Sequence, residues 1–259
     1  MVKNNSITKV AITGSTLLTL NSMREIIKLE KYKIIYVFGI SDENKLKKTN
    51  SVDLKLFCKQ NNILLDESED WKSCHTFCTD KDIDLIISLG DSRIVPNNIV
   101  NNFEVLGNHG ARLPNVQGGA SLVWGRLLNY YYWDVSIMKL RERVDSGEIL
   151  KSRQFHYHRN TTEQEFTTRA DSETVEILIE VLKGNFKPIE NKKWQVRIAK
   201  HTDSYLAVEI LKFCLDNQIP IYLPPRTPKD GIIKKHWPKD FIDVFKKANN
   251  CPYPKWSEE

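Results

Sequence analysis

The chain has 259 residues, 41% hydrophobic and 27% charged, which is the composition of an ordinary soluble globular protein. No apolar run approaches the ~20 residues that a membrane-spanning helix needs, and the N-terminus has no signal-peptide core, so we expect a cytoplasmic protein without a membrane partner. The net charge is +5, but the basic residues form no dense patch with interleaved aromatic residues, which argues against a nucleic-acid partner. A mildly positive surface suits an anionic small molecule.

Cysteine usage argues against both a disulfide framework and a metal centre. Five cysteines is an odd number, and no secretion signal accompanies them. The cluster Cys74-His75-x-x-Cys78 lacks a second ligand pair at zinc-finger spacing, and His156 and His158 on one strand lack a third ligand. We therefore predict buried thiols and no metal.

The first hundred residues alternate between strand-like and helical patterns. β-branched and apolar strands are expected over 7–12, 32–38, 63–65 and 82–89, with helices to about residue 29 and over 52–60. This order predicts a Rossmann-like α/β fold with a doubly wound, mostly parallel sheet. Gly14 stands alone, without the G-x-G-x-x-G fingerprint, which argues against a nicotinamide-dependent oxidoreductase.

Polar side chains follow two separate strand-like segments in the middle of the chain. Asn108 and His109 come at the carboxyl end of a strand expected over 103–106, where open α/β sheets gather their ligands. A helix over 121–129 and an alternating strand over 135–140 precede the turn Asp145-Ser-Gly147. An imidazole and a carboxylate delivered from two loops suit acid–base chemistry.

The same segment resembles the core signature of the folate-dependent formyltransferases. The matching residues are His109-Gly-Ala-Arg-Leu-Pro, Gly118-Gly119-Ala-Ser, Trp124 and Asp145-Ser-Gly-Glu-Ile, and the separation of 36 residues between His109 and Asp145 fits the family. The family's asparagine lies two residues before the histidine, where this chain has Gly107. Either Asn108 takes over its role, or the site lacks a side-chain amide.

The resemblance implies that His109 stabilises an oxyanion or shuttles a proton, with Asp145 as proton acceptor and Asn108 as the local amide. It also implies N10-formyltetrahydrofolate as the formyl donor, with its pterin held by the loop after the 82–89 strand. The expected folate-binding residues are Ser88, Leu89, Gly90, Arg93, Ile94, Val95 and Asp145. The expected substrate-binding residues are Gly118, Gly119 and Trp124. Each of these residues, taken singly, also suits a structural role, so order and spacing together favour the family.

The second half of the chain predicts helices over 161–182, 204–217 and 241–248 around a Pro-rich segment at 222–231. The tail Arg226-x-Pro-x-Asp-Gly-Ile, Trp237 and Cys251-Pro-Tyr-Pro also resembles family members, whereas 190–222 shows no correspondence. We expect a catalytic domain over 1–185 and a small C-terminal region over 186–259.

The chain length favours a nucleotide-linked amino sugar as the small-molecule substrate, with Tyr130–Trp133 as an aromatic run that either stacks on the base or fills surface. A homodimer is left open. The alternatives are a non-catalytic folate- or nucleotide-binding relative and a formyltetrahydrofolate hydrolase.

Overall fold

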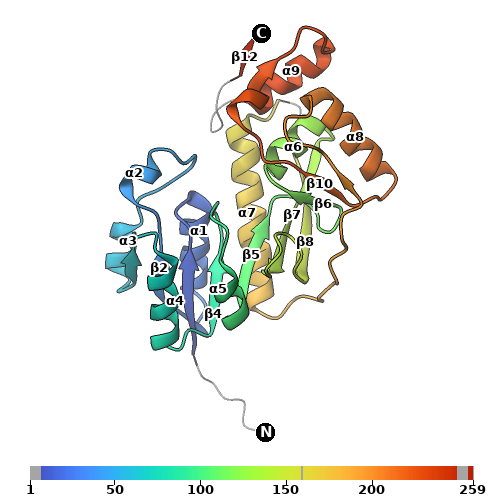
Figure 1. Ribbon diagram of the computed structural model, residues 1–259. Coiled ribbons are helices and arrows are strands. Elements are labelled where there is room, and N and C mark those ends of the chain that lie inside the picture. Colours follow the sequence, from blue (N-terminus) through green and yellow to red (C-terminus); the bar gives the residue numbers. More distant parts are fainter. Residues whose placement is uncertain (1–6, 159, 250–255, 259) are drawn as a thin grey trace.

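A seven-stranded sheet forms the centre of the protein, whose computed structural model describes residues 7–158, 160–249 and 256–258 (Figure 1). The strand order is β3-β2-β1-β4-β5-β7-β8. The five parallel strands are β1 (Thr8–Thr13), β2 (Tyr32–Phe38), β3 (Leu64–Asp66), β4 (Leu85–Ser88) and β5 (Val105–His109). The antiparallel edge consists of β7 (Tyr132–Lys139) and β8 (Ile149–His156). The predicted Rossmann-like fold class is confirmed.

Helices cover both faces of this sheet because its strands are apolar on both sides. One core cluster joins the sheet to α1 (Leu17–Ile26), α3 (Lys55–Gln60) and α7 (Glu163–Leu182). A second cluster, on the opposite face, joins it to α4 (Trp71–Asp80) and α5 (Asn97–Asn102), which the sequence did not indicate. The short α2 (Asp42–Lys45) precedes a loop over the carboxyl edge. Cys74 and Cys78 are buried in α4 as free thiols.

The longest helix, α7, begins at a capping box in which the Thr162 hydroxyl accepts from the Glu165 N–H and the Glu165 carboxylate accepts from the Thr162 N–H. Phe166, Ala170 and Ile177 belong to the stripe that it buries against the sheet. No helix of the described residues is long and apolar enough to cross a membrane.

The chain beyond residue 185 is joined to the sheet domain by a second, parallel sheet. Its strands are β6 (Val116–Gly118), β10 (Ile221–Leu223) and β9 (Val196–Arg197), in that order. Three helices lie beside this sheet: α6 (Ser121–Leu128), α8 (Ser204–Asp216) and α9 (Lys239–Ala248). Of these, α6 packs against both α8 and α9 (Figure 1). The remaining elements are the 3-10 turn η1 (Pro228–Gly231), β11 (Ile232–Ile233) and β12 (Ser257–Glu258). The tail motif at 251–254 lies outside the described residues.

Candidate active site

His109 and Asp145 meet at the carboxyl end of β5, where both side chains are almost fully buried. The His109 Nδ1 atom lies 3.4 Å from the Asp145 Oδ1 atom. On the other side of the ring, Nε2 lies 2.9 Å from the backbone carbonyl oxygen of Val116. Both ring nitrogens therefore face oxygen acceptors, which a doubly protonated ring can satisfy at the same time.

Asp145 reaches His109 because the connection between β7 and β8 folds back over one face of the sheet. Leu140 starts this connection and donates its N–H to the Val105 carbonyl. Asp145 itself has a positive φ of 52°, a left-handed conformation that is uncommon outside glycine. Its Oδ2 atom accepts the Gly118 N–H at 2.7 Å, so the carboxylate is held between β5 and β6. The structure thus brings His109 and Asp145 together as the sequence led us to expect, although His109 is the last residue of β5 and not part of a loop.

Asn108 is not brought to this pair. Asn108 lies inside β5, where successive side chains point to opposite faces of the sheet, so it points away from the face that carries His109. Its neighbour across the antiparallel pair is Ile137, which packs in the core cluster on the α7 side. Among the described residues, no hydrogen bond involves the Asn108 side chain. The expected role of Asn108 as an amide beside His109 therefore finds no support in the geometry.

Gly107 is the position that shares a face with His109, and an aliphatic side chain fills the space beside it. A Cβ atom at Gly107 would lie 2.5 Å from the Leu140 Cδ2 atom and 2.9 Å from its Cγ atom. An asparagine does not fit there unless Leu140 moves. Of the two alternatives that the sequence left open, the geometry favours a site without the family's side-chain amide.

The expected folate loop leaves the sheet next to β5, because Ser88 pairs with Gly107 in the register of β4 and β5. The first residues of this loop already contact the rest of the protein through side-chain or backbone atoms. Ser88 bonds the Thr13 hydroxyl, Leu89 is buried and its carbonyl accepts from Thr19, and the Gly90 carbonyl accepts from Lys48 Nζ.

Arg93 anchors the same loop to the end of β2. Its guanidinium forms an ion pair with Asp91, donates to the carbonyls of Phe38 and Gly39, and lies 4.4 Å from the centre of the Phe38 ring. Val95 is buried, whereas Ile94 is 72% exposed. A rigid loop that exposes one large apolar side chain beside its backbone fits the edge and face of a flat heterocycle.

Gly118, Gly119 and Trp124 lie where the C-terminal region packs on the domain. Gly118 has a φ of 100°, and a side chain there would collide with the backbone of Leu223. Gly119 lies against Pro225. Trp124 is 2% exposed, and its indole N–H donates to the Pro224 carbonyl. Only Gly118 contacts the His109–Asp145 pair, through its backbone N–H, and the burial of Trp124 favours a packing role.

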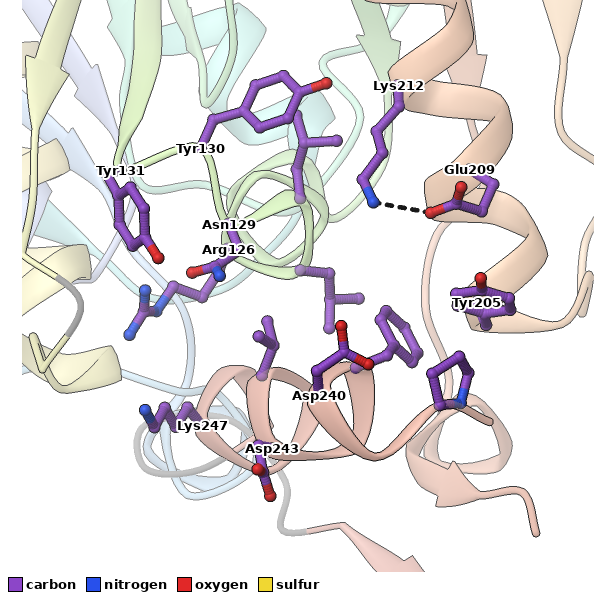
Figure 2. Close-up of a pocket in the computed structure, with 15 residues that line it drawn as sticks. Arg126, Asn129, Tyr130, Tyr131, Tyr205, Glu209, Lys212, Asp240, Asp243 and Lys247 are labelled. Carbon is purple, nitrogen blue, oxygen red and sulfur yellow. Dashed lines mark hydrogen bonds and ion pairs between the residues drawn. The ribbon is translucent and has the colours of Figure 1, made fainter. Parts of the chain in front are cut away.

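The aromatic run after α6 borders a pocket of about 610 Å³ between α6, α8 and α9. Figure 2 shows Tyr130 and Tyr131 beside this pocket, with Lys212 on the α8 side and Asp240 on α9. The pocket opens at the C-terminal end of α6, whereas Gly118, which contacts Asp145, precedes the N-terminal end of α6. The structure does not bring the tyrosines to His109.

Asn191 is the site residue that sequence reasoning missed. It comes from the stretch without family correspondence, and its Nδ2 atom donates to the backbone carbonyl of Asp145 at 2.8 Å. No local sequence signal marks it, because the contact joins positions 46 residues apart.

The fold and the site together define a class of protein: an α/β protein with an imidazole–carboxylate pair at the carboxyl edge of its parallel sheet. No protein-family model matches the sequence. The methionyl-tRNA formyltransferase of Mycoplasma pneumoniae is 24% identical over 179 residues, which cover 68% of this chain and 58% of that enzyme. The chain thus matches less than two thirds of the length of this relative.

Two solved structures share the fold over nearly the whole chain. A 4-N formyltransferase from Francisella tularensis has a TM-score of 0.67 at 13% identity, covering 97% of this chain and 92% of that one. The N-formyltransferase from Helicobacter canadensis, in complex with folinic acid and dTDP-3-aminofucose, has a TM-score of 0.63 at 15% identity, covering 93% and 80%. The chain is thus similar in sequence to methionyl-tRNA formyltransferases and similar in fold to N-formyltransferases.

Proposed function

We propose that this protein transfers a formyl group from N10-formyltetrahydrofolate to the amine of a nucleotide-linked amino sugar. The observation that carries the proposal is the buried His109–Asp145 pair at the carboxyl edge of β5. The folate donor supplies an activated formyl group, and the exposed Ile94 with its neighbouring loop backbone is the surface that fits its ring.

Formyl transfer requires a donor for the developing oxyanion and an acceptor for the proton of the attacking amine. The His109 Nε2–H, which in this structure points at the Val116 carbonyl, is the group that can donate to the formyl oxygen. Asp145 stabilises the protonated ring through Nδ1 and accepts the proton released by the amine, while the Gly118 N–H keeps its carboxylate oriented. The bond from the formyl carbon to the acceptor nitrogen forms as its bond to N10 of the folate breaks, and the proton that Asp145 took from the amine passes to N10, so atoms and charge balance.

The choice of an amino sugar is supported by fold neighbours that cover almost all of this chain and most of their own length. One of them was crystallised with folinic acid and dTDP-3-aminofucose. These neighbours are under 25% identical, so they support a substrate class and not a particular sugar or nucleotide.

Methionyl-tRNA is a second candidate acceptor, contrary to the expectation of no nucleic-acid partner. The sequence relatives are methionyl-tRNA formyltransferases. Residues 186–259 also hold 14 Lys and Arg against 9 Asp and Glu, which equals the +5 excess of the entire chain. A basic C-terminal region next to the site would attract a phosphate backbone.

The test is a competition among acceptors with N10-formyltetrahydrofolate as the donor. Nucleotide-linked amino sugars, methionyl-tRNA and water alone are incubated separately, and products are followed by mass. A gain of one formyl group on an amino sugar supports the proposal, formylated methionyl-tRNA replaces it with the second candidate, and formate in the buffer-only sample identifies a hydrolase. Folate binding without any product would indicate a non-catalytic relative.

A further inference from the structure

The segment 189–192 is fastened at three successive points, two of them on the active-site loop or its end and one on β6. The backbone of Ile189 exchanges two hydrogen bonds with that of Ile149, the residue at which the loop ends. Asn191 Nδ2 donates to the Asp145 carbonyl at 2.8 Å. The Lys192 carbonyl accepts from Gln117 Nε2 at 2.6 Å.

Asp145 needs such support because its backbone lies in the left-handed region at φ 52°. A non-glycine residue in that region costs on the order of 1 kcal/mol and persists only where its surroundings hold it. Within the loop itself, the Arg143 carbonyl accepts from the N–H and hydroxyl of Ser146, which closes the turn but does not bond Asp145. The tethers on Asp145 are therefore Gly118 at the carboxylate and Asn191 at the carbonyl.

The amide of Asn191 is oriented by this one bond. Its Oδ1 atom is buried and has no hydrogen-bond partner, so the Nδ2 donor is the only polar contact that this side chain makes within the described structure.

We propose that Asn191 is the positioning residue that holds Asp145 in its left-handed conformation and thereby aims the carboxylate at His109. The inference rests on the proposed function and deepens it, because it assigns a role to a segment that shows no correspondence to the family signature. Asn191 acts through Asp145 and does not touch the reacting atoms. Loss of its N–H lets the loop relax, so the carboxylate leaves the ring while the rest of the fold stays.

The experiment compares Asn191→Ala, Asn191→Gln and Gln117→Ala with wild type. Gln117→Ala is the matched control, because it removes a side-chain amide that fastens the same segment without contacting Asp145. For Asn191→Ala we expect kcat to fall by roughly 10- to 100-fold, the scale of a misplaced catalytic group, with KM for the folate donor within a few-fold of wild type. Asn191→Gln keeps an N–H donor on a longer arm and should recover part of the loss. Gln117→Ala should lower the thermal midpoint at least as much as Asn191→Ala, with a smaller change in kcat.

A readout without turnover separates this inference from the proposed function. The ring nitrogens of His109 are followed by ¹⁵N NMR, with a His109→Asn sample to assign them. Their shifts should change in Asn191→Ala and stay close to wild type in Gln117→Ala. If wild type formylates no amine, the proposed function fails and the NMR comparison alone decides the role of Asn191. Unchanged His109 signals in Asn191→Ala, or equal losses of kcat in both alanine variants, would overturn the inference.

Discussion

Replacing Asp145 by asparagine is the sharpest test of the proposed chemistry, because it keeps the size of the side chain and removes its charge. The remaining oxygen can still accept the Gly118 N–H, which leaves the amide nitrogen facing His109 Nδ1. The ring thereby loses the carboxylate acceptor that lay 3.4 Å from Nδ1. Opposite charges 4 Å apart attract by about 4 kcal/mol at an effective dielectric constant of ~20. If roughly two thirds of this acts in the transition state, kcat falls by about 10²-fold, within the range for general acid–base catalysis.

The assay measures kcat and the single-turnover rate constant of the bound complex. Direct titrations give the affinities for folate and for the acceptor. The matched control is Asp134→Asn, which removes another buried carboxylate, paired with Arg112 at 2.6 Å, from the neighbouring strand. It should cost stability and leave kcat per bound complex near that of wild type. The reasoning is refuted if Asp145→Asn abolishes binding while kcat per bound complex survives, because Asp145 would then only hold the loop in place.

Three further outcomes follow from the geometry. Asn108→Ala should keep turnover within a few-fold of wild type, since its side chain leaves β5 away from His109; a ~10²-fold loss, typical of one oxyanion donor, would contradict this. Gly107→Ala should destabilise by about 1–3 kcal/mol in denaturant unfolding, and by less when Leu140→Ala is also present, whereas equal costs would show that Leu140 is not the obstacle. Burial raises the pKa of Glu163 to about 8, outweighing the attraction of Arg126. Because the folded-state pKa is the higher one, the stability that protonated Glu163 contributes is complete below pH 4.5 and lost as the pH rises through 8, by about 5 kcal/mol at most. Urea unfolding at several pH values should show a flatter dependence for Glu163→Gln than for wild type, and parallel curves would contradict it.

The alternation of apolar strands and helices in the first hundred residues was enough to predict the parallel sheet. Hydrophobic periodicity is a local property, and it directly reflects which faces an element buries. The cap of α7 is a local feature too, because Thr162 and Glu165, three residues later, bond each other's backbone N–H groups. The order and spacing of His109, Gly118 and Asp145 indicated, through their resemblance to the formyltransferase signature, that the imidazole and the carboxylate belong to one site.

Tertiary structure decided the details on which the chemistry depends. Placing His109 inside β5, and not after it, fixes the face on which Asn108 points, and strand boundaries are uncertain by a few residues when read from sequence. The filling of the Gly107 position by Leu140, the burial of Trp124 under Pro224 and the tether from Asn191 to Asp145 all join positions far apart in the chain. Local pattern carries no information about such contacts, because they arise only when the β7–β8 connection and the C-terminal region fold back over the sheet.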